Sequence, residues 1–547
     1  MLQIREQWGR GISRRKAVLY PSSEKTKYNK HDEVEEPGNL AFRIIYDITG
    51  LVTRQSAETP VGLDRVNLRY AEYLSSRYPN RILFVKQKGQ QAVLVNHADA
   101  RALIDYLDSS WSPDKNNSHY KDSLSFRIEH ARMTDPDYDS FFGLPFSERF
   151  NYLLHRDLKN ELGPEFAWVS RFPFIFKIAY AFIGAASRWP ARTLVRLARF
   201  IGIYSRLHNW KAASRIAFRK RVPEVTLRAF IEKRKHKVPG LKYYYVNSSQ
   251  FVGVSLDLLD RLRESVDMDL IFLIHDLLPV HYPEYFINEF DALLERRALR
   301  ILKLHPHIIT NSKATKEHVE MFAAKKKAET RPIVSMPLGV EEHFLHRPDL
   351  PESTETPPYF MTLCTIEPRK NHLLLLHIWR ELARGGLKEI PRLYLVGRRG
   401  WENENVVDML ERSLPLRGAV LETSDVQDEE LLPMLAGARA LLFPTFAEGW
   451  GMPVVEALSL GTPVICSDIP ALRESGQGVP DYINPLDGRR WMDTIVDYCR
   501  NDSPLRRAQL ERIKSYRPPS WEDHFAGTLD RLLPPVKVEQ EMRRKTG

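Results

Sequence analysis

Two glutamates flank a pair of glycines in the stretch FAEGWGMPVVEALSLGTPV, residues 446–464. Gly449 and Gly451 allow backbone N–H groups to approach a ligand closely, and the helix predicted after them directs its positive end to the same place, which favours a diphosphate. Glu456, about one turn into that helix, is placed to accept hydrogen bonds from ribose hydroxyls. Glu448 could hold sugar hydroxyls or stabilise charge at a reacting carbon. Taken alone, the glutamates could equally be a first-turn acid and an ordinary loop carboxylate.

A basic pair forms the second candidate element, in TLCTIEPRKNHLLLLHIWREL, residues 362–382. Arg369 and Lys370 follow a predicted strand and Pro368, at the entrance to a helix with apolar periodicity. Two cations beside a helix amino end can bind a pyrophosphate and offset the charge that builds on a leaving group. The simpler alternative is a solvated basic loop.

A histidine and an aspartate directly follow another predicted strand in FLIHDLLPVHYPEYF, residues 272–286. His275 could donate to a sugar or orient an acceptor, and Asp276 could receive the acceptor's proton. The alternative is that Asp276 caps the next turn and His275 is a core histidine with its hydrogen bonds satisfied.

These segments share a family resemblance. The string EGWGMPVVEALSLGTPVICSDIPALRES, residues 448–475, closely resembles the E-x₇-E donor motif of retaining GT-B glycosyltransferases, often called family four. The PRKN string, residues 368–371, resembles a motif that contacts the donor diphosphate in that family, and His275–Asp276 resembles its H-D segment. The sequence departs from the family pattern at one position. Relatives usually carry Gly before the threonine that matches Thr365, whereas this sequence has Cys364.

Upstream, TPVGLDRV (59–66) resembles the glycine-containing first loop of a subgroup that builds surface polysaccharides. Gly62 would let this loop approach the donor, whereas Arg65 could bind an anion or simply face solvent. TNSKATKEHV (310–319) also resembles a family segment, with Ser312 as a plausible helix cap. The resemblance covers about residues 42–85 and 243–530.

The resemblance implies roles for individual residues. Those expected to act in catalysis are His275, Glu448, Lys370 and Arg369. Those expected on the donor side are Gly62, Gly449, Trp450, Gly451, Met452, Glu456, Thr365 and Gly397. Asp276 and Arg65 are expected on the acceptor side.

The elements that must position these residues alternate between short apolar runs and helical patterns. Such alternation predicts parallel sheets covered on both faces, and two successive sets predict two doubly wound domains facing a cleft, the GT-B arrangement. We expect a mobile leader at 1–40, an acceptor-side domain at 41–347 with a helical basic insertion at about 100–240, a linker at 348–358, a nucleotide-sugar domain at 359–510, and a carboxyl-terminal helix and tail at 511–547.

The resemblance further implies retaining, metal-independent transfer of a hexose from a nucleotide-diphosphate sugar to a glycan or lipid-linked acceptor, with no cofactor. A mannosyl donor is favoured, while rhamnose, glucose and N-acetylhexosamine donors remain open. The alternative is a degenerate GT-B protein that acts as a membrane-associated scaffold or binding module. No recognised nucleic-acid motif is present, so we expect no nucleic-acid partner.

Charge and composition suggest where such a protein would work. The chain of 547 residues carries a net charge of +10, and residues 171–237 alone hold 17 Lys and Arg against two acids. Aromatic and basic residues alternate at roughly helical spacing in 171–221, which favours an anionic membrane surface, although a solvated helix pair is the alternative. Three scattered cysteines and the lack of a signal-peptide pattern predict a cytoplasmic protein, with possible peripheral attachment to the inner face of the membrane.

Overall fold

The structure is a computed structural model that describes residues 41–54, 60, 62–88, 91–111, 225–235, 238, 240–249, 255–348, 357–385, 389–424 and 426–535. The leader predicted at 1–40 and the basic stretch at 171–221 lie outside these residues, as do most of the predicted insertion and linker and the end of the predicted tail. The described part contains two sheets, one of seven strands and one of six.

The first sheet has the strand order β3-β2-β1-β4-β5-β6-β7. Its strands are β1 (Phe42–Asp47), β2 (Ile82–Lys88), β3 (Gln91–Val95), β4 (Lys242–Asn247), β5 (Met268–Ile274), β6 (His307–Thr310) and β7 (Val334–Ser335). All six residues of β1, FRIIYD, are buried, as expected of a parallel strand covered on both faces. Its position between β2 and β4 explains this burial.

One strand departs from the predicted parallel arrangement. β3 pairs with β2 in antiparallel register, from Phe84 opposite Val95 to Lys88 opposite Gln91. Only residues 89 and 90 separate these strands, and so short a connection closes a hairpin, whereas a parallel crossover needs a dozen residues or more. The first sheet is therefore mixed at one edge.

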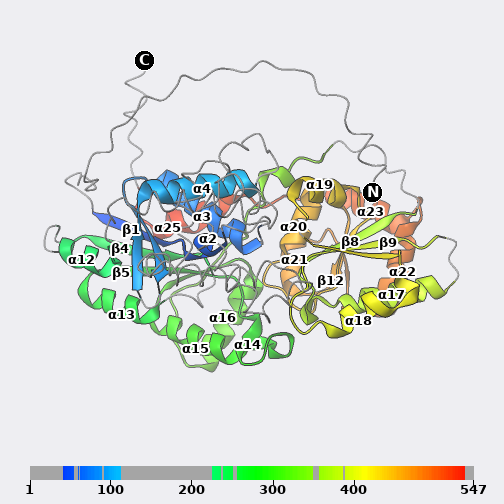
Figure 1. The fold of residues 1–547 in the computed structure, drawn as a ribbon, viewed down its shortest axis with the longest axis horizontal. Helices are drawn as coiled ribbons and strands as arrows, with labels where there is room; N and C mark the ends of the chain where they lie inside the picture. The colour runs from blue at the N-terminus through cyan, green and yellow to red at the C-terminus, as the bar shows by residue number, and fades with distance from the viewer. Residues whose placement is uncertain are drawn as a thin grey trace, which may run out of the picture. The chain divides into compact units, whose positions relative to one another are not determined.

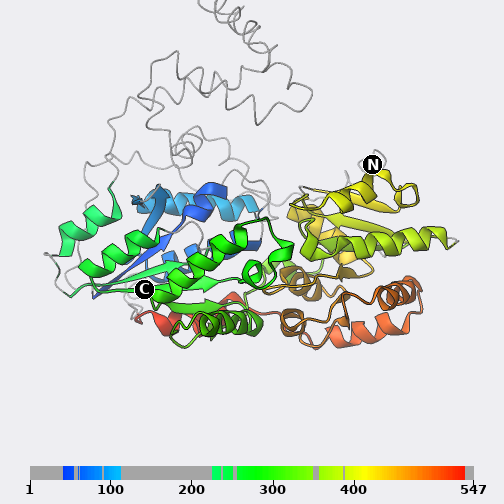
Figure 2. The ribbon, with the colours of Figure 1, turned by 90° about the horizontal axis from the view of Figure 1, so that it is seen from below.

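Helices cover both faces of the first sheet (Figures 1 and 2). On one face lie α2 (Thr49–Arg54), α3 (Gly62–Arg77) and α4 (His97–Trp111), and on the other lie α13 (Leu256–Ser265), α15 (Phe290–Lys303) and α16 (Lys313–Lys325). The short elements are α12 (Leu227–Lys235), α14 (Leu278–His281) and the 3₁₀ turns η5 (Pro283–Tyr285) and η6 (Glu342–Phe344). Two-sided coverage is the doubly wound pattern that the alternation predicted.

The second sheet is parallel throughout, with the order β10-β9-β8-β11-β12-β13. Its strands are β8 (Tyr359–Leu363), β9 (Arg392–Val396), β10 (Val420–Thr423), β11 (Leu441–Phe443), β12 (Val464–Ser467) and β13 (Asp481–Ile483). Leu441 and Phe443 of β11 face one buried cluster and Leu442 faces another, because successive strand side chains point to opposite faces. Both clusters are closed by helices.

The second domain contains α17 (His372–Arg384), α18 (Glu404–Arg412), α19 (Asp428–Gly437), α20 (Met452–Ser459), α21 (Pro470–Gly476), α22 (Gly488–Cys499) and α23 (Pro504–Ile513), with 3₁₀ turns η7 (Pro368–Lys370) and η8 (Leu414–Leu416). In α17, Leu375, Trp379 and Leu382 recur every three or four residues and are buried, which is the apolar stripe of an amphipathic helix. Two doubly wound domains in tandem confirm the predicted fold class.

The end of the chain packs on the first domain. Helices α24 (Trp521–Gly527) and α25 (Leu529–Leu532) follow α23 and contact α3. The Phe525 ring stacks on Tyr73 with centroids 4.0 Å apart, and the buried His524 ring nitrogen Nε2 is 2.7 Å from the hydroxyl of Tyr70. The chain therefore runs from the first domain to the second and back again.

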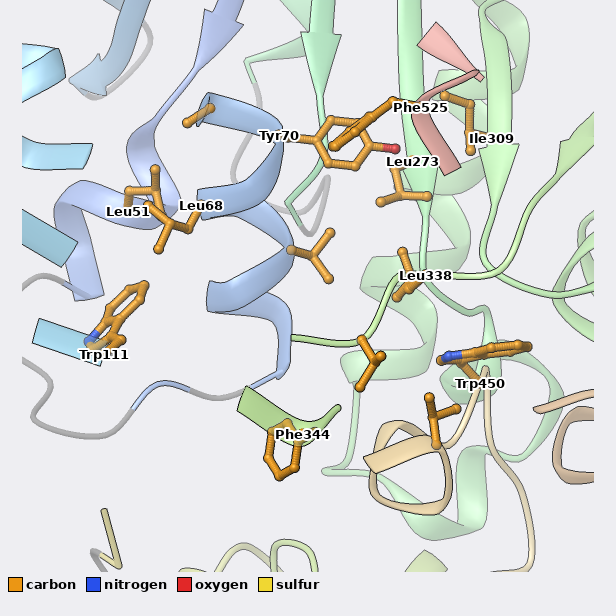
Figure 3. Packing of buried hydrophobic residues seen from close by; sticks show 14 of the residues in the cluster. Leu51, Leu68, Tyr70, Trp111, Leu273, Ile309, Leu338, Phe344, Trp450 and Phe525 are labelled. Atoms are coloured by element: carbon orange, nitrogen blue, oxygen red, sulfur yellow. The ribbon is translucent and has the colours of Figure 1, made fainter. Parts of the chain in front are cut away.

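A single buried hydrophobic cluster contains side chains from both domains. Leu273 and Ile309 of the first sheet, Leu338 and Phe344 of the segment after it, and Trp450 of the second domain are all members (Figure 3). Strands β5 and β6, the segment after β7 and the loop after β11 thus contribute to one apolar interior.

Candidate active site

A compact charged cluster joins the loops after β8 and β11. Arg369 Nη1 lies 2.8 Å from Glu448 Oε2, and Lys370 Nζ lies 2.5 Å from Glu448 Oε1. Arg369 Nη2 also donates to Glu367 Oε1 at 2.6 Å. The side chains of Arg369, Lys370 and Glu448 are 13%, 10% and 9% exposed, so these charges are largely removed from water. The structure thus brings the adjacent pair Arg369 and Lys370 together with Glu448, which lies 78 positions after Lys370 in the sequence.

Neighbouring charges keep Glu448 and Arg369 ionised. Burial alone would raise the pKa of Glu448, but Arg369 and Lys370 outweigh that effect and hold this pKa below its usual value. Burial would lower the pKa of Arg369, but Glu448 and Glu367 more than offset it, so this pKa is raised. A ligand with two phosphates can therefore replace Glu448 as the anionic partner of the two cations.

Asn371 shapes the turn that presents the basic pair. Its backbone is left-handed, with φ of 57°, a conformation that Asn tolerates better than most residues. Its side-chain Nδ2 donates to the carbonyls of Pro444 and Pro485, each at 3.1 Å. Neither Asn371 nor Glu367 was among the predicted site residues, although the asparagine belongs to the motif string that was used to find the pair.

Local geometry explains why positions 449 and 451, in the loop before α20 that we call the glycine loop, are both glycine. A Cβ at Gly449 would lie 2.5 Å from the carbonyl oxygen of His275, and Gly451, at φ of 98°, is the cap of α20. Met452 is the first residue of that helix, and a Cβ at Gly62 would lie 3.8 Å from its Cγ. Residues predicted from opposite halves of the sequence therefore meet at the amino end of α20.

Other predicted donor-side residues have packing contacts. The Trp450 side chain is buried in the shared cluster, with its Nε1 lacking a partner among the described residues. A Cβ at Gly397 would lie 2.0 Å from the carbonyl oxygen of Cys364, and one at Gly400 would lie 2.7 Å from Cγ2 of Thr365. These glycines let the loop after β9 pack on the loop after β8. Burial raises the pKa of Cys364 to about 11, so its thiol is neutral.

Glu456 lies in a second buried charge group. Burial raises its pKa to about 7, with Arg65 opposing this and Asp428 and Glu341 adding to it. Nη2 of Arg65 donates to both carboxylate oxygens of Asp428, each at 2.8 Å. Of the two roles considered for Arg65, exposure to solvent is wrong, because the side chain is buried and paired with Asp428 of α19 in the second domain. Its partner has no local signal in the sequence. Binding of an anionic ligand by Arg65 stays a prediction.

His275 and Asp276 follow β5 as predicted. Burial lowers the pKa of His275, which is therefore neutral, and its Nε2 lies 2.7 Å from the carbonyl oxygen of Ser248. Because a carbonyl can only accept, Nε2 carries the proton and Nδ1 is left as an acceptor. Asp276 Oδ1 accepts from the backbone N–H of Leu278 at 3.1 Å, which is the capping role considered as the alternative. Asp276 lies against the glycine loop, because a Cβ at Gly449 would be 3.1 Å from the Cβ of Asp276, and its charge adds to the rise in the pKa of Arg369.

Neither a cluster of metal-binding side chains nor a membrane-spanning helix occurs in the described ranges. No group of three or more His, Cys, Asp or Glu side chains there could hold a metal ion. None of the helices described combines the length and apolar character needed to cross a bilayer.

Part of the chain matches a known protein family. Residues 348–476 match the family described as "Glycosyl transferases group 1". The matched range includes Arg369, Lys370, Glu448 and Glu456, and so covers the charged cluster, the glycine loop and the buried glutamate of α20. It does not include the first domain.

Known relatives cover part of the chain. The serotype-specific mannosyltransferase WbdA of Escherichia coli is 28% identical over 222 residues, which are 38% of this chain and 27% of that protein. The O-antigen chain mannosyltransferase B of Escherichia coli is 31% identical over 172 residues, 31% of this chain and 45% of that protein. The chain therefore spans less than half the length of either relative.

Among solved structures, the sucrose-phosphate synthase of Thermosynechococcus elongatus is 19% identical, with a TM-score of 0.41, and covers 56% of this chain and 77% of its own. A likeness at this TM-score does not indicate a shared function.

Proposed function

We propose that this chain is a retaining glycosyltransferase that moves a hexose from a nucleotide-diphosphate sugar onto a glycan or lipid-linked acceptor. The observation that carries the proposal is the buried cluster of Arg369, Lys370 and Glu448 beside the amino end of α20. Two fixed cations and a helix amino end form a strong site for a diphosphate. The match of residues 348–476 to glycosyl transferases supports this assignment.

In the proposed reaction, the bond between the anomeric carbon and the diphosphate oxygen breaks, and Arg369 and Lys370 stabilise the negative charge that develops there. The acceptor oxygen bonds to the same carbon on the same face, and its proton passes to the departing phosphate. This proton route leaves little need for a protein base, which agrees with the capping contact of Asp276. The two cations perform the charge stabilisation that a divalent metal supplies elsewhere, so we propose metal-independent transfer.

The remaining residues bind and orient the substrates. Glu456 accepts hydrogen bonds from the ribose hydroxyls, and Glu448, displaced from the cations by the diphosphate, binds hydroxyls of the donor sugar. His275 presents Nδ1 as an acceptor, because its Nε2–H donates to the carbonyl oxygen of Ser248. In this arrangement a donor sugar hydroxyl donates to His275 rather than accepting from it.

Mannose is our preferred donor sugar. The names of the two relatives describe mannosyltransferases, one of them acting on O-antigen chains, and these names support a role in surface-polysaccharide assembly. We propose that the protein works in the cytoplasm, where an anionic membrane surface could receive residues 171–221, which lie outside the described part of the chain. Neither nucleic acid nor a cofactor is part of the proposal.

A panel of nucleotide sugars tests the proposal. Purified protein is incubated with GDP-mannose, UDP-glucose, UDP-N-acetylglucosamine and dTDP-rhamnose, and donor hydrolysis and thermal shift are measured with and without EDTA. We expect one donor to stabilise the fold and turn over, unaffected by EDTA. Lys370→Ala should lower turnover about 100-fold or more, as the loss of a charge-stabilising group does in other enzymes.

Arg412→Ala is the matched control, since Arg412 is an exposed cation on α18. It should leave turnover unchanged. If no nucleotide sugar shifts the melting temperature, the alternative of a degenerate scaffold is favoured. Near-normal turnover in folded Lys370→Ala would exclude the proposed site.

A further inference from the structure

The glycine loop of the second domain is held by two hydroxyl groups from the first. The carbonyl oxygen of Gly449 accepts from Ser312 Oγ at 2.6 Å and from Thr315 Oγ1 at 3.2 Å. Ser312 and Thr315 belong to the cap and first turn of α16, and both side chains are fully buried. A carbonyl oxygen has two lone pairs, and this buried one has two hydroxyl groups within hydrogen-bond distance. The direction of the Gly449 carbonyl group is therefore well defined.

Fixing this carbonyl also fixes the next amide. The peptide unit is planar and trans, so the N–H of Trp450 must point opposite to the carbonyl of Gly449. Ser312 and Thr315 therefore turn that N–H away from α16. This amide lies between Glu448, which contacts the two cations, and Gly451, which is the N-cap of α20. It is one of the backbone groups expected to face a diphosphate.

Neither hydroxyl acts only on the loop. Ser312 Oγ accepts from the backbone N–H of Thr315 at 2.9 Å, which confirms the predicted cap. Thr315 Oγ1 lies 3.2 Å from the carbonyl oxygens of both His275 and Gly449, so the two carbonyls share its single hydroxyl hydrogen. The same two side chains thus contact the segments that carry the histidine and the glycine loop. A side chain at position 449 would clash with the carbonyl oxygen of His275, so a bulkier residue at this position could not accept from the two hydroxyl groups in the same way.

A second interdomain contact supports the same end of α16. The backbone N–H of Lys313 donates to Glu474 Oε2 of α21 at 2.7 Å. The free N–H groups of this helix end are therefore occupied by its own cap and by the second domain. The first turn of α16 is fixed in position against the second domain at two points.

We propose that Ser312 and Thr315 are positioning residues, which orient the Gly449–Trp450 peptide for diphosphate binding. The inference rests on the proposed function, because it assigns a purpose to the loop as a donor-phosphate site. A consequence is that the donor site is complete only while the first domain contacts the glycine loop. Donor affinity then depends on residues of the domain that binds the acceptor.

Hydroxyl-deleting and hydroxyl-keeping variants test this role. Thr315→Val keeps the shape of the side chain and removes its hydroxyl group, whereas Thr315→Ser keeps the hydroxyl group. For Ser312, Ser312→Ala removes the hydroxyl group and Ser312→Thr keeps it. We measure the dissociation constants of GDP and UDP by calorimetry, the KM and kcat for the donor that turns over, and the melting temperature. Thr315→Val and Ser312→Ala should weaken nucleotide binding and raise donor KM about fivefold each, while Thr315→Ser and Ser312→Thr should stay near wild type.

Ser503→Ala is the matched control for loss of a buried cap. Ser503 caps α23 by accepting from the N–H of Arg506 at 3.0 Å, away from the charged cluster. It should lower the melting temperature with no change in nucleotide affinity. Unchanged affinity and KM in folded Thr315→Val would overturn the positioning role alone. Wild-type protein that binds neither GDP nor UDP would overturn the proposed function and this inference together.

Discussion

Replacing Glu448 with glutamine should destabilise the free protein yet strengthen its binding of a nucleoside diphosphate. The carboxylate neutralises two cations that are only 13% and 10% exposed. Glutamine keeps the shape and removes the charge. Lys370 then loses its only ion-pair partner among the described residues and keeps a cation–π contact with Phe443 at 5.0 Å, whereas Arg369 retains Glu367.

The expected magnitude follows from these remaining contacts. Breaking a buried ion pair by removing one partner typically costs about 3–5 kcal/mol. Because Arg369 keeps a second carboxylate, we expect the lower end, about 3 kcal/mol in the free energy of unfolding. In wild type, an arriving diphosphate must displace Glu448, whereas the variant has no anion to displace. GDP should therefore bind the variant more tightly, and at saturation the stability difference should shrink.

Urea unfolding with and without GDP, together with calorimetry, measures both effects. Glu411→Gln is the control, because Glu411 forms an exposed ion pair with Arg399 and should change stability by about 1 kcal/mol or less. Turnover of Glu448→Gln should fall although nucleotide binding improves. If the variant is as stable as wild type, or if it binds GDP more weakly, then Glu448 is not the group that the diphosphate replaces.

Three further predictions concern other contacts. Arg65→Asp or Asp428→Arg alone should destabilise the fold by about 3 kcal/mol or more, and the double charge swap should recover about 2 kcal/mol, measured as a double-mutant cycle in urea. Nucleotide affinity, measured by calorimetry, should fall up to about tenfold from pH 8 to pH 6. The reason is that Glu456, with a pKa of about 7, loses its charge as the pH falls. Glu456→Gln should remove this pH dependence. Phe525→Ala should cost about 3–5 kcal/mol of unfolding free energy, and a smaller loss would show that α24 does not stabilise the first domain.

Most of the strands were predictable because their signal is local. Runs such as FRIIYD and MDLIFLI are long enough and apolar enough to identify buried strands, and polar residues that follow a strand must lie at the carboxyl edge of its sheet. For this reason His275, Arg369 and Glu448 could each be assigned to that edge from the sequence. The antiparallel direction of β3 was missed, although its two-residue connection to β2 was the available clue.

The contacts between the two domains could not be predicted. Arg65 and Asp428 are separated by 363 positions, and Ser312 and Gly449 by 137. No periodicity or spacing links such residues, because their meeting depends on how one folded domain is placed on another. Glu367 was missed for a different reason: a carboxylate two residues from an arginine is common in any loop, and only its burial shows that it fixes the guanidinium.

The return of the chain to the first domain limits how this protein can be divided. Cutting within residues 348–358 would leave the first fragment without His524 and Phe525, which contact Tyr70 of α3, and without Trp521, which packs on both of them. The exposed face would bind α24 supplied by the other fragment. Two separately expressed halves should therefore behave as complementing fragments rather than as independent domains, and a synthetic peptide spanning 519–535 should be able to solubilise the first half.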